Sequence, residues 1–289
     1  MIEQPLRLPD GRELCVASYG PDGGQPMIAF HGTPGSHRMW HCGVAAAHAH
    51  GFRLIAADRP GYGRSTAHPG RTLATALDDL AHVVAAYQLD RFGLLGVSGG
   101  TPFACSAAAT YGSRISSLGL VSPLAPVADA EMRPHLSLRD RLLFLQASRY
   151  PRSLSLASKP MTAFIRQFPR AAFQIARLSA GAGDRALLGQ SEVAAIYVAD
   201  GIAGAADGLD GAITDLGIYG RPWGVDFARI TAPSCLWIGT ADTIVPIKAA
   251  IALGHRINGC EITQLPGAGH FWIFAAMPQI LAKLRAVNG

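Results

Sequence analysis

The sequence predicts an α/β fold: a mostly parallel sheet with helices on both faces, interrupted by an inserted helical segment. Two observations support this prediction. Short, continuously apolar runs alternate with helical patterns at both ends of the chain, as expected for parallel strands buried on both faces. From about residue 123 to residue 225 the strand signal disappears, over a length too great for a loop. We therefore predict a core of residues 1–122 and 226–289, with a helical lid over residues 123–225.

The expected strands are short apolar runs bounded by turn residues, at residues 14–19, 27–30, 52–57, 92–97, 118–121, 234–238 and 260–265. Because no helix separates the first two runs, they suggest an antiparallel hairpin at the edge of the sheet. Helical patterns of the core begin after His37, at Thr72 and after Ser98, and recur at residues 247–256 and 278–287. Within the insertion, helices are expected over residues 138–150, 161–178 and 186–206, with breaks at Pro151, Pro160 and the Gly181/Gly183 pair.

Composition indicates a globular protein. The chain has 289 residues, of which 49% are hydrophobic and 16% charged, enough to bury a large core and too apolar for disorder. No apolar run reaches the roughly 18–20 residues of a membrane-spanning helix, and the first residues lack the features of a secretory signal. The five cysteines are scattered, with no Cys-x-x-Cys pair, and are expected to be reduced. We therefore expect a soluble, cytoplasmic protein.

The charge is unevenly distributed within the insertion. Residues 131–180 contain nine Lys/Arg and two acidic residues, a net charge of +7. Residues 181–220 contain one arginine and six acidic residues, a net charge of −5. We expect the two halves to neutralise each other, which argues against nucleic acid or a membrane as a partner.

The pattern Gly96-Val97-Ser98-Gly99-Gly100 follows an expected strand, and Pro102 then suits the first turn of a helix. This Gly-x-Ser-x-Gly arrangement is typical of a nucleophile elbow, where a strained turn exposes a serine hydroxyl. An ordinary β-to-α turn is the alternative. A nucleophilic serine requires a base that takes its proton, an acid that orients the base, and hydrogen-bond donors for the oxyanion.

An acid and a base follow Ser98 in the order that such an elbow requires. Asp242 comes directly after the expected strand 234–238, and His270 lies in a glycine-rich loop after the strand 260–265. We predict Asp242 and His270 as the acid and the base. The aspartates of the insertion (Asp200, Asp207, Asp210 and Asp215) are expected to face solvent, as is His255.

The loop after the expected strand 27–30 suits an oxyanion hole. We predict that the backbone N–H groups of Thr33 and Gly99 hold the oxyanion, while His31 and Gly32 support the loop. His31 precedes the serine and is therefore not predicted as the base. A plain turn is the alternative for this loop.

Taken together, these motifs resemble the α/β-hydrolase family. The resemblance rests on His31-Gly32-Thr33-Pro34-Gly35, residues 58–65 (Asp-Arg-Pro-Gly-Tyr-Gly-Arg-Ser), the Ser98 elbow, Asp242 and the Pro266–His270 loop. It implies an eight-stranded sheet with a helical cap, and catalysis without a metal or an organic cofactor. Ser98 argues against the family's haloalkane dehalogenases and epoxide hydrolases, which use an aspartate nucleophile. Thr33 replaces a glycine typical of proline iminopeptidases, so a peptidase is less expected.

The remaining patterns do not indicate a specific functional site. Gly61-Tyr62-Gly63 lacks the third glycine of a dinucleotide loop, and His37 and His41, which share a helix face, are expected on the surface. Trp223 is expected to pack where the lid rejoins the core, with a place in the wall of the pocket as the alternative. If arginines of the lid faced the pocket, an anionic substrate would be favoured, but solvent or the acidic half of the lid is the preferred location for them.

The sequence therefore predicts a hydrolase that cleaves a small carboxylic ester or lactone through an acyl-enzyme on Ser98. A hydrolase of carbon–carbon bonds of the meta-cleavage type and an aminopeptidase are alternatives that use the same triad. A receptor that binds a small molecule without turnover is an alternative of another class. The acyl group, the leaving group and the oligomeric state stay open.

Overall fold

A single eight-stranded sheet runs through the computed structural model, which describes residues 1–288. Its strands are β1 (Ile2–Arg7), β2 (Glu13–Tyr19), β3 (Gln25–Phe30), β4 (Phe52–Ala57), β5 (Phe92–Val97), β6 (Ile115–Val121), β7 (Ser234–Gly239) and β8 (Glu261–Leu265), in the spatial order β1-β2-β4-β3-β5-β6-β7-β8. The pairs β1–β2 and β2–β4 are antiparallel and all others are parallel. The predicted α/β fold is confirmed.

The expected hairpin needs a correction. The strand β2 pairs with β1 and β4, whereas β3 lies on the far side of β4. Sequence reasoning missed β1 because this edge strand is largely exposed and contains Pro5, so that it has no apolar run. The antiparallel edge exists, but its outer strand is β1.

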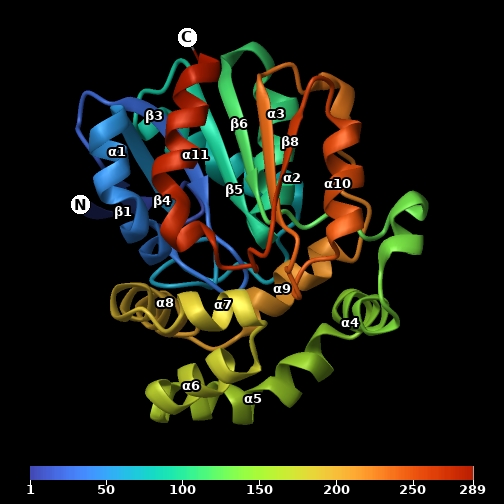
Figure 1. The fold of residues 1–289 in the computed structure, drawn as a ribbon. Coiled ribbons are helices and arrows are strands. Elements are labelled where there is room, and N and C mark those ends of the chain that lie inside the picture. Colours follow the sequence, from blue (N-terminus) through green and yellow to red (C-terminus); the bar gives the residue numbers. More distant parts are fainter. Residues whose placement is uncertain (289) are drawn as a thin grey trace.

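Helices cover both faces of the sheet (Figure 1). On one face lie α1 (Val44–His50) and α11 (Ile273–Asn288), and on the other lie α2 (Leu73–Ala86), α3 (Thr101–Tyr111) and α10 (Ile247–Arg256). Successive strand residues point to opposite sides, so Leu94 belongs to one buried cluster and Leu95 to the other. This burial on both faces explains why the central strands are continuously apolar.

Between β6 and β7 the chain forms six α-helices, which we call the insert. They are α4 (Leu138–Arg149), α5 (Pro151–Gln167), α6 (Pro169–Ser179), α7 (Ala182–Leu187), α8 (Ser191–Gly204) and α9 (Asp210–Tyr219). The helices α7, α8 and α9 lie against the end of the sheet, and α5 and α6 form an outer layer (Figure 1). The insert falls within the predicted lid, residues 123–225, whose limits as a domain stay a prediction.

The helix breaks of the insert differ from the prediction. Helix α5 continues through Pro160, and the break comes at Phe168 instead. Phe168 precedes Pro169 and Tyr150 precedes Pro151, and both have φ and ψ outside the helical region because a following proline crowds the backbone. Gly183, an expected break, lies inside helix α7, and neither α7 nor α9 was predicted.

Within residues 1–288, no helix combines the length and the apolar character needed to cross a bilayer. The five cysteines are all free thiols, as expected.

Candidate active site

Ser98 lies on a sharp turn between β5 and α3. Its φ is +50°, in the left-handed region that residues with a side chain rarely adopt. The two outer glycines of the pattern make this turn possible. A Cβ atom on Gly96 would lie 2.8 Å from the Ala104 Cβ, and one on Gly100 would lie 2.4 Å from the Phe30 carbonyl oxygen. The strained turn is therefore closely packed from both sides, and it has the geometry of a nucleophile elbow.

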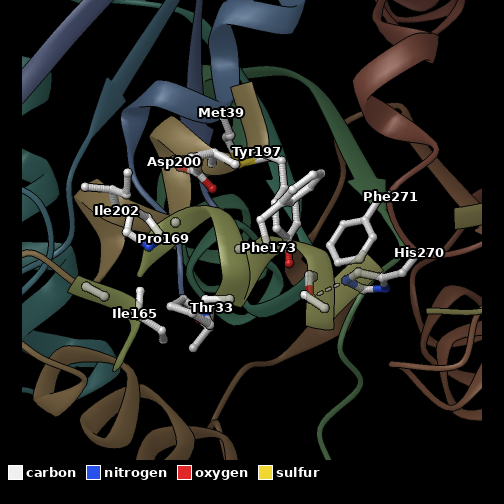
Figure 2. A pocket seen from close by; sticks show the side chains of 18 of the residues that line it. Thr33, Met39, Ile165, Pro169, Phe173, Tyr197, Asp200, Ile202, His270 and Phe271 are labelled. Carbon is white, nitrogen blue, oxygen red and sulfur yellow. Dashed lines mark hydrogen bonds between the residues drawn. The ribbon is translucent and has the colours of Figure 1, made fainter. Parts of the chain in front are cut away.

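The side chains of Ser98, His270 and Asp242 form a hydrogen-bonded row (Figure 2 draws the first link). The His270 Nε2 lies 3.1 Å from the Ser98 Oγ, and the His270 Nδ1 lies 2.8 Å from the Asp242 Oδ2. The other oxygen of Asp242 accepts the backbone N–H groups of Ile244 and Val245 at 2.8 and 2.9 Å, which fixes the carboxylate. With the carboxylate on Nδ1, the imidazole presents Nε2 to the serine, as a general base must.

Residues 31–36 form the loop after β3. His31 is buried, its Nε2 accepts the backbone N–H of Arg59 at 3.1 Å, and its Nδ1 lies 2.8 Å from the Gly32 carbonyl oxygen. Because Nε2 accepts, Nδ1 bears the proton and donates to Gly32. Burial and the Arg59 cation lower the pKa of His31 well below its ordinary value, so the ring is neutral. His31 therefore braces this loop.

The loop packs directly against the elbow. The Tyr219 hydroxyl from α9 donates to the Gly99 carbonyl oxygen at 2.7 Å and lies 2.6 Å from the Thr33 Oγ1. A Cβ atom on Gly99 would approach the Thr33 Oγ1 to 2.4 Å. The structure thus brings Thr33 and Gly99 side by side next to Ser98. Their roles as oxyanion donors stay a prediction.

A buried carboxylate of the insert, Asp215, connects α9 to the same loop. It accepts hydrogen bonds from Arg59 Nε at 2.9 Å, Tyr62 OH at 2.6 Å and Arg71 at 2.5 Å. Burial favours the neutral acid, but the Arg59 and Arg71 guanidiniums outweigh it and hold the pKa of Asp215 at about 2. The aspartate is therefore ionised at neutral pH and balances two buried cations.

Arg59 connects Asp215 to the loop of residues 31–36. Its guanidinium donates to the carbonyl oxygens of His31 and Gly32, at 2.5 and 2.9 Å, and to the Thr33 Oγ1 at 2.9 Å. Because Arg59 is itself held by Asp215 of the insert, the position of the loop depends on how α9 docks on the core.

A second buried carboxylate of the insert, Asp184 on α7, holds the histidine loop. Its two oxygens accept the backbone N–H groups of His270 and Phe271, each at 2.8 Å. A Cβ atom on Gly269 would lie 2.2 Å from the Asp184 Cγ, so this glycine allows the carboxylate to approach the backbone. The insert therefore contacts the backbone of His270 directly and, through Arg59, the backbone of the 31–36 loop.

A third carboxylate, Asp200 on α8, lines the cavity and binds Ser36 at the end of the 31–36 loop. Its Oδ1 accepts the backbone N–H of Ser36 at 2.7 Å and the Ser36 hydroxyl at 2.8 Å. Burial raises the pKa of Asp200 to about 7, since these hydrogen bonds offset only part of the desolvation. Figure 2 shows the Asp200 carboxyl beside Met39 and Tyr197.

The raised pKa of Asp200 predicts a pH-dependent stability. Between its ordinary pKa near 4 and its folded pKa of about 7, the folded state holds a proton that the unfolded state has released, so stability falls as pH rises through this range. The uncharged variant Asp200→Asn should gain about 2 kcal/mol relative to the parent between pH 5 and pH 8. Thermal denaturation of both proteins across this range measures the gain. The exposed control Asp207→Asn should show the same pH dependence of stability as the parent. A stability difference between Asp200→Asn and the parent that does not change with pH would contradict the prediction.

A cavity of about 530 Å³ opens above Ser98 and His270. Its walls are mostly apolar and come from α5, α6, α8 and the loop after β8, with Phe173, Tyr197, Phe271 and Phe274 packed edge-to-face or tilted beside His270. Among residues 1–288, the lining contains no lysine and no arginine. The size suits a small-molecule ligand, and the wall suits an uncharged one.

The family model for the alpha/beta hydrolase fold matches residues 25–275 of the chain. The chain belongs to this family. A protein of Synechocystis provisionally assigned as a non-heme chloroperoxidase is 26% identical over 252 residues, covering 86% of this chain and 85% of that protein. A bromoperoxidase from Bacillus anthracis superimposes with a TM-score of 0.77 at 21% identity, and a thermophilic esterase from Thermogutta terrifontis with a TM-score of 0.68 at 23% identity, each over the full length of both chains.

Several residues of this alpha/beta hydrolase lie elsewhere than the sequence predicted. Trp223 is buried in the core cluster with Tyr219 and Phe227, the packing location preferred from the sequence, and is absent from the residues that line the cavity above Ser98. His37 is buried rather than on the surface, because its ring lies 3.0 Å from the Asp58 carboxylate and 3.4 Å from that of Glu3. His41 and His255 are exposed, as expected.

Sequence reasoning also missed the buried carboxylates of the hydrolase. Asp200 and Asp215 were expected to face solvent, and only Asp207 and Asp210 do so. One signal was available: from Val193 to Gly204, and again from Gly211 to Tyr219, the aspartate is the single charged residue in an apolar helix. A lone carboxylate in such a helix indicates a buried partner.

Proposed function

We propose that this alpha/beta hydrolase cleaves carboxylic esters or lactones with an uncharged, apolar acyl group, through an acyl-enzyme on Ser98. The observation that supports the proposal best is the hydrogen bond between His270 Nε2 and Ser98 Oγ, 3.1 Å long, at the base of an apolar cavity. The esterase among its structural neighbours agrees with this reaction class.

In the proposed mechanism, His270 Nε2 takes the proton of Ser98 Oγ as this oxygen attacks the carbonyl carbon. The negative oxygen of the tetrahedral intermediate accepts hydrogen bonds from the backbone N–H groups of Thr33 and Gly99. His270 then returns the proton to the leaving oxygen, and the alcohol departs. Water, deprotonated by His270, attacks the acyl-enzyme; His270 then returns this proton to Ser98 Oγ as the acyl–oxygen bond breaks and the acid leaves. Asp242 stabilises the imidazolium in both steps.

The wall of the cavity bears on the substrate class. The arginines of the insert do not line the cavity, so the anionic substrate considered from the sequence is not favoured. Transfer of an apolar acyl group from water to this wall contributes roughly 0.8 kcal/mol per buried methylene. We therefore expect longer uncharged acyl groups to lower KM until the cavity is full.

A panel of p-nitrophenyl esters with acyl chains of increasing length, each neutral or ending in a carboxylate, tests this proposal. Neutral esters should be turned over at least about tenfold better than their anionic counterparts, because a carboxylate would be desolvated without a cation. The same panel should include lactones, amino-acid amides and dienoate diketones. Exclusive cleavage of the amides or diketones would replace the proposal with one of the alternatives, and binding without any turnover would favour a receptor.

A fluorophosphonate probe and peptide mapping identify the nucleophile independently of substrate choice. The probe should label Ser98 and no other serine. Labelling of another serine, or none, would contradict the proposed acyl-enzyme.

A further inference from the structure

The basic half of the insert is not neutralised by the acidic half. Helices α4, α5 and α6 contain eight Lys/Arg and a single acidic residue, Asp140. Within residues 1–288, none of these eight cations forms an ion pair, whereas the acidic residues Asp184, Asp200 and Asp215 turn inward to the loops of the site. The expected neutralisation within the insert is therefore wrong, because three of the six acidic side chains in its acidic half, Asp184, Asp200 and Asp215, have partners in the core and the other three form no ion pair with these cations in the described chain.

The same three helices expose large apolar side chains. Of the fourteen exposed large hydrophobic residues in the described chain, ten lie between residues 138 and 178: Leu138, Leu142, Leu143, Leu145, Tyr150, Leu156, Met161, Phe168, Ile175 and Leu178. On α4, Leu138, Leu142 and Leu145 recur at the i, i+4, i+7 spacing of one helix face and are 54–72% exposed. We call these ten side chains and the exposed cations between them the outer face.

The outer face and the cavity share two helices. Met161 on α5 and Ile175 on α6 are more than half exposed to solvent and also line the cavity. The outer layer formed by α5 and α6 (Figure 1) thus contributes side chains both to the outer face and to the wall of the cavity above Ser98. A partner surface bound to the outer face would therefore lie close to the cavity.

We infer that the outer face docks on an anionic lipid bilayer. Its apolar side chains would enter the interfacial region, and its lysine and arginine side chains would meet lipid phosphates, as in amphipathic helices that lie in a membrane surface. A second copy of the chain fits worse, because a symmetric contact would bring eight unpaired cations against eight more. This reading reverses the expectation from the sequence that no membrane is a partner.

Flotation of the full-length protein with lipid vesicles tests the inference without any substrate, so its result is independent of the proposed hydrolysis. The protein should float with vesicles of phosphatidylcholine containing phosphatidylglycerol, and at least about tenfold less with phosphatidylcholine alone. High salt should weaken this binding. Failure to float with anionic vesicles, or equal binding to both vesicles, would overturn the inference.

Paired variants assign the binding to this face. The charge reversals Arg152→Glu and Lys159→Glu together, or Leu142→Ser with Leu156→Ser, should each reduce binding about tenfold or more. All four side chains are exposed and none lines the cavity, so thermal melting should be little changed. The matched controls Arg7→Glu with Arg91→Glu, and Ile2→Ser, lie outside the insert and should bind like the parent. Equal losses in the controls would contradict the assignment.

Two further measurements locate the contact. Relative to the parent with its four native tryptophans, Leu156→Trp should show an additional blue shift of emission with anionic vesicles, because the new indole leaves water. In sedimentation experiments, the parent and the variant with Leu142→Ser and Leu156→Ser should have the same oligomeric state. A dimer that these substitutions dissociate would overturn the inference and assign the outer face to self-association.

Discussion

The variant Ser98→Ala should lose ester hydrolysis by about 10⁴-fold or more in kcat/KM. Alanine removes the attacking oxygen, whereas the cavity and the oxyanion loop remain, so substrate binding should change little. Because Ser98 and His270 act as one unit, His270→Ala should cost about as much, and the double variant should be no worse than either single one. Initial rates with a neutral p-nitrophenyl ester, together with product binding by calorimetry, measure both effects.

The matched control for this experiment is Ser106→Ala, a buried serine on α3 outside the row. It should retain the activity of the parent. Two outcomes would contradict a mechanism in which His270 activates Ser98. One is a kcat/KM of Ser98→Ala within tenfold of the parent. The other is a loss in the double variant equal to the product of the two single losses.

Of the proposed variants, Asp215→Ala should lose the most free energy of unfolding. It leaves Arg59 and Arg71 buried without their counter-ion, a change that costs about 3–5 kcal/mol and should lower Tm by about 10 °C. Because Arg59 holds the carbonyl groups of His31 and Gly32, kcat should also fall by about 100-fold, the effect of misplacing one oxyanion donor, with KM little changed. Calorimetry and steady-state kinetics at a temperature where the variant is folded separate the two effects.

Asp215→Asn keeps the shape of the side chain and should recover part of both losses, and the exposed control Asp207→Asn should show neither. Acid should reproduce the loss of stability in the parent. Asp215 has a folded pKa of about 2, below its ordinary value near 4, so its contribution is present above pH 4 and disappears as pH falls toward 2. A variant Asp215→Ala that loses stability but keeps kcat would show that α9 stabilises the fold without positioning the oxyanion loop.

The fold and the residues of the row Ser98–His270–Asp242 could be predicted from the sequence because their signals are local. A buried parallel strand is apolar throughout, and the elbow requires glycine at positions 96 and 100 because only a hydrogen fits there. Asp242 and His270 each lie in the loop that follows a parallel strand, so the order of the elements brings them to the same edge of the sheet. For these features, position along the chain determines position in space.

The sequence pattern did not predict the edge strand β1 or the full length of helix α5. The strand β1 is exposed and lacks an apolar run, and Pro160 lies within a helix that the pattern had ended. Both depend on what packs beside the backbone, which a local window does not contain.

The sequence by itself determined the fold class, the strand-to-helix elbow and the chemical types able to serve as nucleophile, base and acid. Only the tertiary structure decided where the charged side chains of the insert lie. Whether Asp184, Asp200 and Asp215 face water or the core depends on groups far away in the chain, such as the backbone of His270 and the guanidinium of Arg59. Burial of a charge is favourable only where such partners converge, and that convergence is a property of the folded molecule. The same docking turns these three acidic side chains inward and leaves the cations of α4, α5 and α6 without ion pairs among the described residues.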